Sequence, residues 1–222
     1  MNLLAIFSLA LFVLSPVLAH FNVLSALLAF QIFLFAGVCS FILMLWALST
    51  FFFHHPRPKS IELTIFGFLP AVLMMVLAGN ARKYPIINDV STDLEHPPAF
   101  SKVVNSEFPE AFKTIIRENY SDVKPAEFNL PPAKVFEKAK TVISKRPDWE
   151  VIASNPQTGA IECVATNFIF NFKDDFVIRV SPNSGGGSRV DMRSRSRQGK
   201  GDIGANAKRI REFLASLLDP GI

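Results

Sequence analysis

LLAIFSLALFVLSPVLAHFNVLSALLAFQIFLFAGVCSFILMLWALSTFFF, the sequence of residues 3–53, contains no aspartate, glutamate, lysine or arginine. Burying so many apolar side chains requires lipid or a very large protein, and one helical membrane span needs about 20 apolar residues. Of the 23 basic residues in this chain of 222, 21 lie after Gly79, and so do 18 of the 19 acidic residues. The sequence therefore predicts an α-helical membrane anchor followed by a domain exposed to water.

About three membrane spans fit within the anchor, which we place in residues 1–80. A break at residues 20–22 predicts a tight hairpin between the first two spans, and residues 54–59, HHPRPK, predict a polar loop stiffened by proline. The first span is also consistent with a cleaved signal peptide, although no lysine or arginine precedes its apolar run. The expected spans run from about Leu3 to Ala19, from about Val23 to Phe52 and from Ile61 to Leu77.

Charges in the loops predict the orientation of the anchor. Arg57 and Lys59 favour the cytoplasmic side for the second loop, because positive charges are retained there. An uncleaved chain of three spans then has its C-terminal domain outside, which in a bacterium means a multi-pass inner-membrane protein with a periplasmic domain. Arg82 and Lys83, directly after the third span, favour the opposite orientation. We expect the periplasmic placement.

The part of the chain after the anchor changes its periodicity twice. An irregular polar segment at residues 81–105 precedes a domain at residues 106–222. In that domain, helical spacing follows prolines near Pro109 and at Pro131, and proline suits the first turn of a helix. The period then changes to two, and an amphipathic helical pattern returns at residues 205–218. We expect strands at residues 149–154, 160–172, 176–181 and 189–198. The sequence predicts an α+β domain with a four-stranded antiparallel sheet and a C-terminal helix.

The last predicted strand carries the most suggestive chemistry. Its sequence from Val190 to Arg197 is VDMRSRSR, and a strand places alternate side chains on one face. Arg193, Arg195 and Arg197 then form a cationic row with a spacing of about 6.5–7 Å, which Arg179 of the neighbouring strand can join. Such a row is either solvated and paired with carboxylates such as Asp191, or it faces an anion such as a phosphate, a carboxylate or a lipid headgroup.

A glycine-rich turn follows this strand. Residues 199–204, GKGDIG, match the G-x-G-x-x-G spacing of dinucleotide-binding turns. The chain ends with the next helix, however, so no βαβ unit can form and we expect no nucleotide cofactor. The glycines instead predict a tight turn from strand to helix, with Asp202 as the helix N-cap. The exposed helix N-terminus beside three arginines remains a candidate anion pocket.

The polar segment before the domain offers a second group of candidates. Asp89, Asp93, Glu95 and His96 are possible metal ligands or acid–base groups, but their spacing matches no known metal loop. Turn formation and backbone capping explain these residues better, and we expect no metal. The arginine–serine run resembles RNA-binding sequences, but it lies in a predicted strand, so we expect no nucleic acid. Cys163 is expected to be a small buried apolar residue.

Three runs of sequence resemble one known family. They are YPIINDVSTD at residues 84–93, followed by PPAF, FKDDFVIR at residues 172–179, and the run from DMRS at residue 191 to GANAKRI at residue 210. Together they resemble the domain-of-unknown-function family fourteen-ninety-nine over about residues 84–218. That resemblance implies a domain found in proteobacteria and photosynthetic eukaryotes, often behind a few membrane spans, and no established activity. It marks residues 86–98 and 193–209 as the family signature, and we expect these two segments to form one site.

We therefore expect a non-enzymatic, membrane-tethered domain that binds an anionic amphiphile such as a lipid, or a partner protein in the membrane. Phe168, Phe170 and Phe172 are candidates to hold an apolar tail, although a plain core explains them better. The alternatives are a hydrolase-like enzyme that uses Asp89 or Asp93 with the arginines, and a scaffold subunit of a membrane complex. The expected anion-binding residues are Arg179, Arg193, Arg195, Arg197, Gly199, Gly201, Asp202, Asn206 and Arg209, and the second polar segment contributes Asp89, Thr92 and Asp93.

Overall fold

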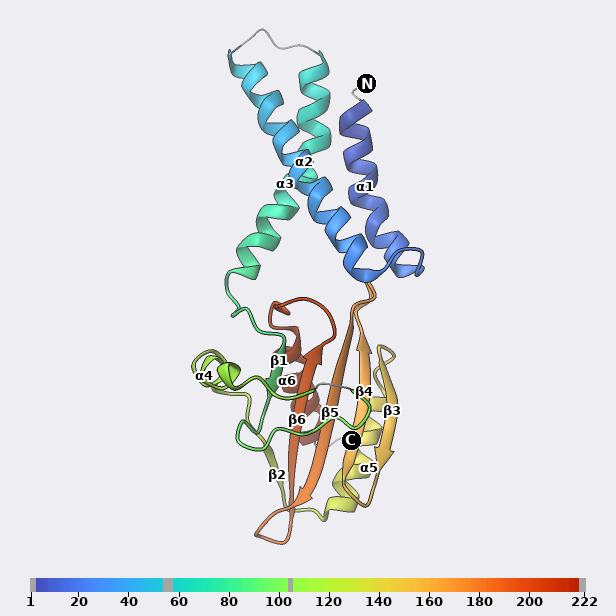
Figure 1. Ribbon diagram of the computed structural model, residues 1–222, viewed down its shortest axis with the longest axis vertical. Helices are drawn as coiled ribbons and strands as arrows, with labels where there is room; N and C mark the ends of the chain where they lie inside the picture. Colours follow the sequence, from blue (N-terminus) through green and yellow to red (C-terminus); the bar gives the residue numbers. More distant parts are fainter. Residues whose placement is uncertain (1–2, 54–57, 104–105, 220–222) are drawn as a thin grey trace. The chain divides into compact units, whose positions relative to one another are not determined.

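The computed structural model describes residues 3–53, 58–103 and 106–219 (Figure 1). The chain divides into two compact units. The N-terminal unit comprises Met1–Lys83 together with Phe168–Asn171, and the C-terminal unit comprises Tyr84–Asn167 together with Phe172–Ile222. Each unit has its own packed interior.

The N-terminal unit is built from three helices, α1 (Leu3–His20), α2 (Ala26–Phe53) and α3 (Pro58–Ala81). Only α1 and the Ala26–Thr50 part of α2 are long and apolar enough to cross a membrane among the residues described, and a signal sequence near the N-terminus passes the same test. The apolar part of α3 is shorter, Gly67–Ala81. The third predicted span is therefore not confirmed, and the histidines of the predicted polar loop lie outside the described residues.

Small residues bring these helices close together. The Ser8 hydroxyl donates to the carbonyl oxygen of Ala36 at 2.9 Å and lies 2.9 Å from the Ser40 hydroxyl. A Cβ atom placed on Gly67 would lie 2.7 Å from the Ser40 carbonyl oxygen, so only glycine fits between α2 and α3 at this point. Such small-residue contacts are typical of helices that pack inside lipid.

The C-terminal unit contains one antiparallel sheet of six strands, two more than the sequence predicted. The order of the strands is β1-β6-β5-β4-β3, and β2 also pairs with β6. The two missed strands, β1 and β2, have three residues each, which is too short to show a period of two. The bounds of the strands are β1 Asp89–Ser91, β2 Ala126–Phe128, β3 Trp149–Asn155, β4 Ala160–Thr166, β5 Lys173–Pro182 and β6 Ser188–Ser196.

The connection between β4 and β5 also differs from the prediction. The strand predicted at residues 160–172 ends at Thr166, and Asp174, which lies between two predicted strands, is already part of β5. The chain reverses instead between these residues, where Asn171 has a φ of 56°. The predicted aromatic surface of Phe168, Phe170 and Phe172 is therefore not on the sheet.

Three helices complete the C-terminal unit, and α5 and α6 cover one face of the sheet (Figure 1). Alternate strand residues point toward these helices, because successive side chains of a strand face opposite sides. Phe176, Ile178 and Met192 are fully buried there against Ile210 and Phe213 of α6. The helices are α4 (Glu110–Asn119), α5 (Pro132–Ser144) and α6 (Ala205–Leu218).

Candidate functional site

The face of the sheet away from α5 and α6 carries the arginines that the sequence singled out. Asp175 of β5 pairs with Arg195 of β6, so their side chains share this face. Arg193 lies two residues before Arg195, and Arg197 directly follows the end of β6. The predicted arginine row is therefore formed, but it is interleaved with aspartates.

Arg193 is buried, with 2% of its surface exposed, and its guanidinium is bound by the protein itself. Its Nε and Nη2 atoms donate to the two carboxylate oxygens of Asp89 at 3.0 and 2.7 Å. Its Nη1 donates to the Pro98 carbonyl oxygen, and the rings of Phe100 and Phe108 lie 5.0 and 5.1 Å from the guanidinium carbon. These contacts use the planar guanidinium in the way that favours arginine over lysine.

Residues 93–103 and 106–108 cross over this charged face, and we call them the crossing segment. Buried charged side chains of the sheet bind the backbone of the crossing segment. The Glu162 carboxylate accepts hydrogen bonds from the backbone N–H groups of residues 101–102 at 2.7 and 3.1 Å. Arg193 donates to the Ser106 carbonyl oxygen at 2.8 Å. A soluble anion could reach Arg193 only if this segment were displaced.

Two arginines and two aspartates form a neutral cluster at the start of the crossing segment. Arg179 donates to Asp93 and to Asp191, each at 3.0 Å. Arg189 lies 3.3 Å from Asp93 and 3.1 Å from Asp191. Burial raises the pKa of Asp93, but the backbone N–H groups and the two arginines that surround its carboxylate outweigh this effect and lower the pKa overall.

We expect Asp93→Asn to remove part of the acid sensitivity of the domain. Because the folded-state pKa of Asp93 lies below the unfolded value of 3.8, its stabilisation is present above that value and is lost as the pH falls through the folded pKa. At pH 7 the variant should lose about 1.5–3 kcal/mol, the usual worth of hydrogen bonds to a charged group. Thermal unfolding of the wild type and the variant at pH 7 and at pH 3 checks this. If the difference in unfolding temperature between the two proteins were the same at both pH values, the prediction would be contradicted.

The two segments of the expected signature do meet in the structure. Strand β1 pairs with β6, with Val90 opposite Ser194, and Thr92 continues this pairing by hydrogen bonds to the backbone of Met192. Asn206 is fully buried, and its side-chain amide donates to the Asn88 carbonyl oxygen at 3.2 Å.

Buried hydrogen bonds fix α6 against the end of β6. The Ser194 hydroxyl donates to the Asn206 side-chain oxygen at 2.7 Å, and Asn206 donates to the Ser196 hydroxyl at 3.0 Å. Arg209 donates to the Asp174 carboxylate at 2.6 Å. Asn206 and Arg209, both expected ligand residues, are thus bound to protein partners.

The turn between β6 and α6 has the tight form that the glycines predicted. Gly199 and Gly204 have φ values of 87° and 76°. Gly204 is the N-cap residue, not Asp202, but the Asp202 carboxylate accepts hydrogen bonds from the backbone N–H groups of Gly204 and Asn206 at 2.9 and 2.8 Å. Burial raises the pKa of Asp202, which these hydrogen bonds offset only in part. The start of α6 is therefore occupied by a carboxylate of the protein.

Around this turn lies a surface that is both basic and apolar, which we call the turn surface. Its cations are Lys173, Arg197 and Lys200, which are exposed. Arg197 forms a two-point ion pair with Asp175 at 2.9 and 2.6 Å, whereas no ion pair joins Lys173 or Lys200 to any residue that the structure describes. The apolar members are Tyr84, Ile86 and Ile203, which are 40%, 79% and 50% exposed.

Backbone contacts place these residues together at one end of the sheet. Arg197 donates its N–H to the Lys173 carbonyl oxygen at 3.1 Å, and Asp202 donates to the Ile87 carbonyl oxygen at 3.1 Å. The Asn88 side chain donates to the Gly199 carbonyl oxygen at 2.8 Å. This is the end where β6 finishes and β5 begins (Figure 1).

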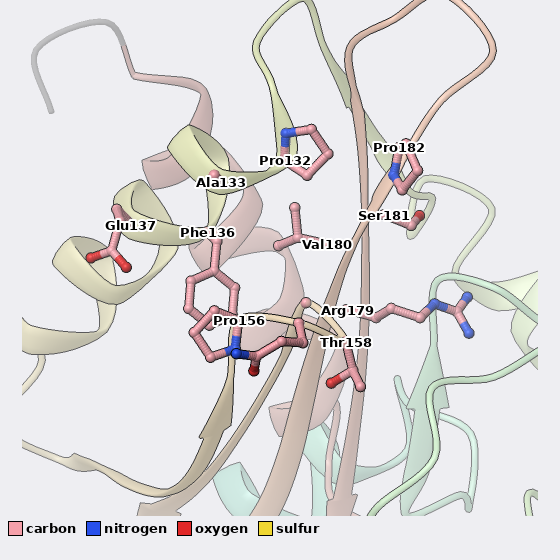
Figure 2. A pocket seen from close by; sticks show the side chains of 12 residues that line it. Pro132, Ala133, Phe136, Glu137, Pro156, Thr158, Arg179, Val180, Ser181 and Pro182 are labelled. Carbon is pink, nitrogen blue, oxygen red and sulfur yellow. The ribbon is translucent and has the colours of Figure 1, made fainter.

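A cavity of about 450 Å³ lies at the other end of the sheet, between the start of α5 and β5. Figure 2 shows Phe136 and Val180 facing this space, with prolines at its rim. Arg179 belongs to the lining, but its guanidinium points away from the cavity (Figure 2). It donates to Asp93 and Asp191 on the charged face. The described lining therefore presents no cation to an anionic ligand.

The remaining candidates have ordinary structural surroundings. Within the described ranges, no group of three or more histidine, cysteine, aspartate or glutamate residues could hold a metal ion. Cys163 is buried, and burial raises the pKa of its thiol to about 12, so the thiol is protonated at neutral pH. Asp89 is buried against Arg193, as described above, and offers no exposed acid–base group.

Sequence reasoning missed several members of the turn surface. Lys173 lies between two of the predicted strands, and Ile86 and Ile203 were not singled out, because exposure of one apolar residue leaves no pattern in a sequence. The one available signal was the position of Ile203 between glycines in a tight turn, where an isoleucine is unusual.

Comparisons with known proteins add the following. A family model described as "Protein of unknown function (DUF1499)" matches residues 89–217. The solved structure entitled "Crystal structure of Ara h 8.0201" is 13% identical, covers 42% of this chain and 91% of its own, and has a TM-score of 0.31, which is too low to support an argument. No curated protein matches the chain.

Proposed function

The chain belongs to the DUF1499 family, and from this premise we propose that it is a membrane-anchored, non-enzymatic domain that binds an anionic amphiphile at the turn surface. The observation that carries the proposal is the contrast between the two groups of cations. Four arginines of the charged face, Arg179, Arg189, Arg193 and Arg197, are paired with aspartates, whereas Lys173 and Lys200 are exposed and have no carboxylate partner in the described part of the chain.

The geometry also supports an amphiphile rather than a small inorganic anion. Ile86 lies against Gly201, the residue after Lys200, and Tyr84 packs against Gly204, while Ile203 belongs to the same turn. A ligand with a negative headgroup and a hydrocarbon part would satisfy both kinds of side chain. Lysine interacts with such a headgroup mainly as a point charge, so it needs no fixed geometry.

We further propose that α3 is the third span of a multi-pass anchor in a bacterial inner membrane, with the C-terminal unit in the periplasm. Arg57, which precedes α3 in the sequence, and Lys59, in the first turn of α3, support this orientation. A reporter enzyme that is active only outside the cytoplasm, fused after Ile222, should be active, and activity of a cytoplasm-only reporter at the same position would overturn the placement.

Removing the two lysine charges should reduce the retention of anionic lipid. We expect the Lys173→Gln/Lys200→Gln variant to bind about 30-fold more weakly, because each lysine near an anionic headgroup contributes about 1 kcal/mol. Lipids that remain with the full chain after purification in native nanodiscs can be identified and counted by mass spectrometry.

A matched control replaces Lys124 and Lys134, which are exposed; Lys134 lies in the first turn of α5, beside the cavity at the other end of the sheet. Lys124→Gln/Lys134→Gln changes the net charge by the same amount and should retain lipid as the wild type does. Equal losses in both variants would show that overall charge matters and not this surface. Wild-type protein with no enrichment of anionic lipid would refute the proposed function itself.

The scaffold alternative is distinguished by its dependence on the spans. If the anchor can be exchanged for unrelated spans without loss of lipid retention, the turn surface carries the specificity. If retention follows the anchor instead, the helices carry it, and the small-residue contacts at Ser8 and Gly67 become the region to test.

A further inference from the structure

We infer that the turn surface lies in the headgroup layer of the membrane that holds the anchor, with Ile86 and Ile203 inserted among the lipids. This inference rests on the proposed function and names its partner as the anionic bilayer surface itself, not a single sequestered lipid. Three features of the C-terminal unit carry it.

The backbone at Ile203 is the first feature. Ile203 has a φ of 52°, in the left-handed region where a β-branched side chain is disfavoured. Its side chain is 50% exposed, so the strain is not compensated by burial in the core. Strain retained at an exposed position indicates a role outside folding. An apolar side chain projecting from a rigid turn is what insertion into a membrane interface requires.

The combination of residue types is the second feature. Lysine and apolar or aromatic side chains that alternate on one small surface are typical of segments that lie in the headgroup region, where the lysines meet phosphates and the apolar groups reach the acyl chains. Tyr84 adds an amphipathic ring, and its ring packs against Gly204, where a Cβ atom would lie only 2.5 Å away. Charge and apolar surface therefore come from one rigid turn.

The contrast between the two ends of the sheet is the third feature. The loops at residues 155–158, NPQT, and 183–187, NSGGG, lie at the opposite end and contain no lysine, arginine or large apolar residue, although Leu130 beside them is 41% exposed. The turn surface, by comparison, starts at Tyr84, three residues after α3 ends at Ala81. The two ends of the sheet therefore differ in the charge of their loops.

Hydrogen exchange of the full chain in nanodiscs tests this inference. Discs of phosphatidylcholine alone are compared with discs of equal parts phosphatidylcholine and phosphatidylglycerol. We expect backbone N–H groups of residues 198–203 to exchange at least about tenfold more slowly in the anionic discs. Residues 183–187, at the other end of the sheet, should exchange at the same rate in both.

Ile203→Asn is the decisive variant. Asparagine tolerates a positive φ better than isoleucine, so the unfolding temperature should stay unchanged or rise, while protection in anionic discs is lost. Loss of protection without loss of stability supports the inference. Protection that survives both Ile203→Asn and Lys173→Gln/Lys200→Gln overturns it.

Different outcomes would overturn lipid binding by the turn surface and its insertion into the headgroup layer. If purified protein retains anionic lipid but exchange at residues 198–203 does not depend on the disc lipid, the ligand is a sequestered molecule and only the inference is overturned. If neither retention nor exchange depends on anionic lipid, the proposed function is overturned with it. If exchange slows only when a second protein is added, the partner is a protein and the inference is wrong.

Discussion

Replacing Arg193 with glutamine is expected to lower the free energy of unfolding of the C-terminal unit by about 3–5 kcal/mol. The substitution leaves the Asp89 carboxylate, which is 1% exposed, without its positive partner. It also removes the hydrogen bonds to Pro98 and Ser106 that hold the crossing segment on the sheet. Since whole domains are stable by only about 5–15 kcal/mol, this is a large fraction of the total.

The fluorescence of Trp149, which packs against Phe176 in the core, can follow unfolding of this unit in a Trp46→Phe background. Arg117→Gln is the matched control. Arg117 makes an equally short ion pair, at 2.6 Å, with Glu95 of the same crossing segment, but both side chains are more than half exposed. Such exposed pairs are worth less than about 1 kcal/mol. Similar losses in the two variants would contradict the structural role of Arg193.

A double substitution separates the ion pair from the space that it fills. Asp89→Leu combined with Arg193→Met should cost less than Arg193→Met alone, because a buried charge without a partner costs more than a pair replaced by apolar groups. The two residues would not interact if adding Asp89→Leu to Arg193→Met lowered the free energy of unfolding as much as Asp89→Leu lowers it in the wild type.

Gly159→Ala is the second substitution with a large expected effect. A Cβ atom at this position would lie 1.9 Å from the Val180 carbonyl oxygen, and Gly159 has a φ of 66°. Gly186 provides the matched control, because its φ is 81° but no atom lies within 4 Å of the added Cβ. Gly186→Ala should cost about 1–2 kcal/mol from backbone strain alone.

Gly159→Ala should cost about 1–3 kcal/mol more than the control, because the turn between β3 and β4 must move away from β5. That turn also forms one wall of the cavity beside α5. Unfolding in urea measures both variants. Equal losses would mean that the turn relaxes freely and that its close approach to β5 contributes nothing to stability.

The sequence predicted the general plan of the chain well, because that plan depends on long patterns. The charge-free N-terminal run and the alternation in β5 and β6 extend over many residues, and each gave the correct type of structure. Strands β1 and β2 were missed because three residues show no period, and both are set by pairing with β6. The third span depends on α3, whose first turns contain Lys59 and Glu62 and so weaken the pattern.

The chemistry of the arginine row could be predicted only up to a choice between two alternatives. The sequence showed that the arginines share a face, but the partner of Arg193 is Asp89, which lies 104 residues earlier in the chain. No local spacing reveals such a pair. The same holds for the crossing segment, which reads as an irregular polar stretch and yet covers the charged face through contacts with Glu162 and Arg193.

Binding of anionic lipid at the turn surface can be measured by photo-crosslinking in membranes. A photo-reactive amino acid in place of Ile86, which is 79% exposed, should form adducts with the mass of an anionic phospholipid. The same amino acid in place of Val151, which is 46% exposed on the opposite edge strand β3, should form few. Adducts with a protein at residue 86, or equal lipid yields at both positions, would contradict this binding.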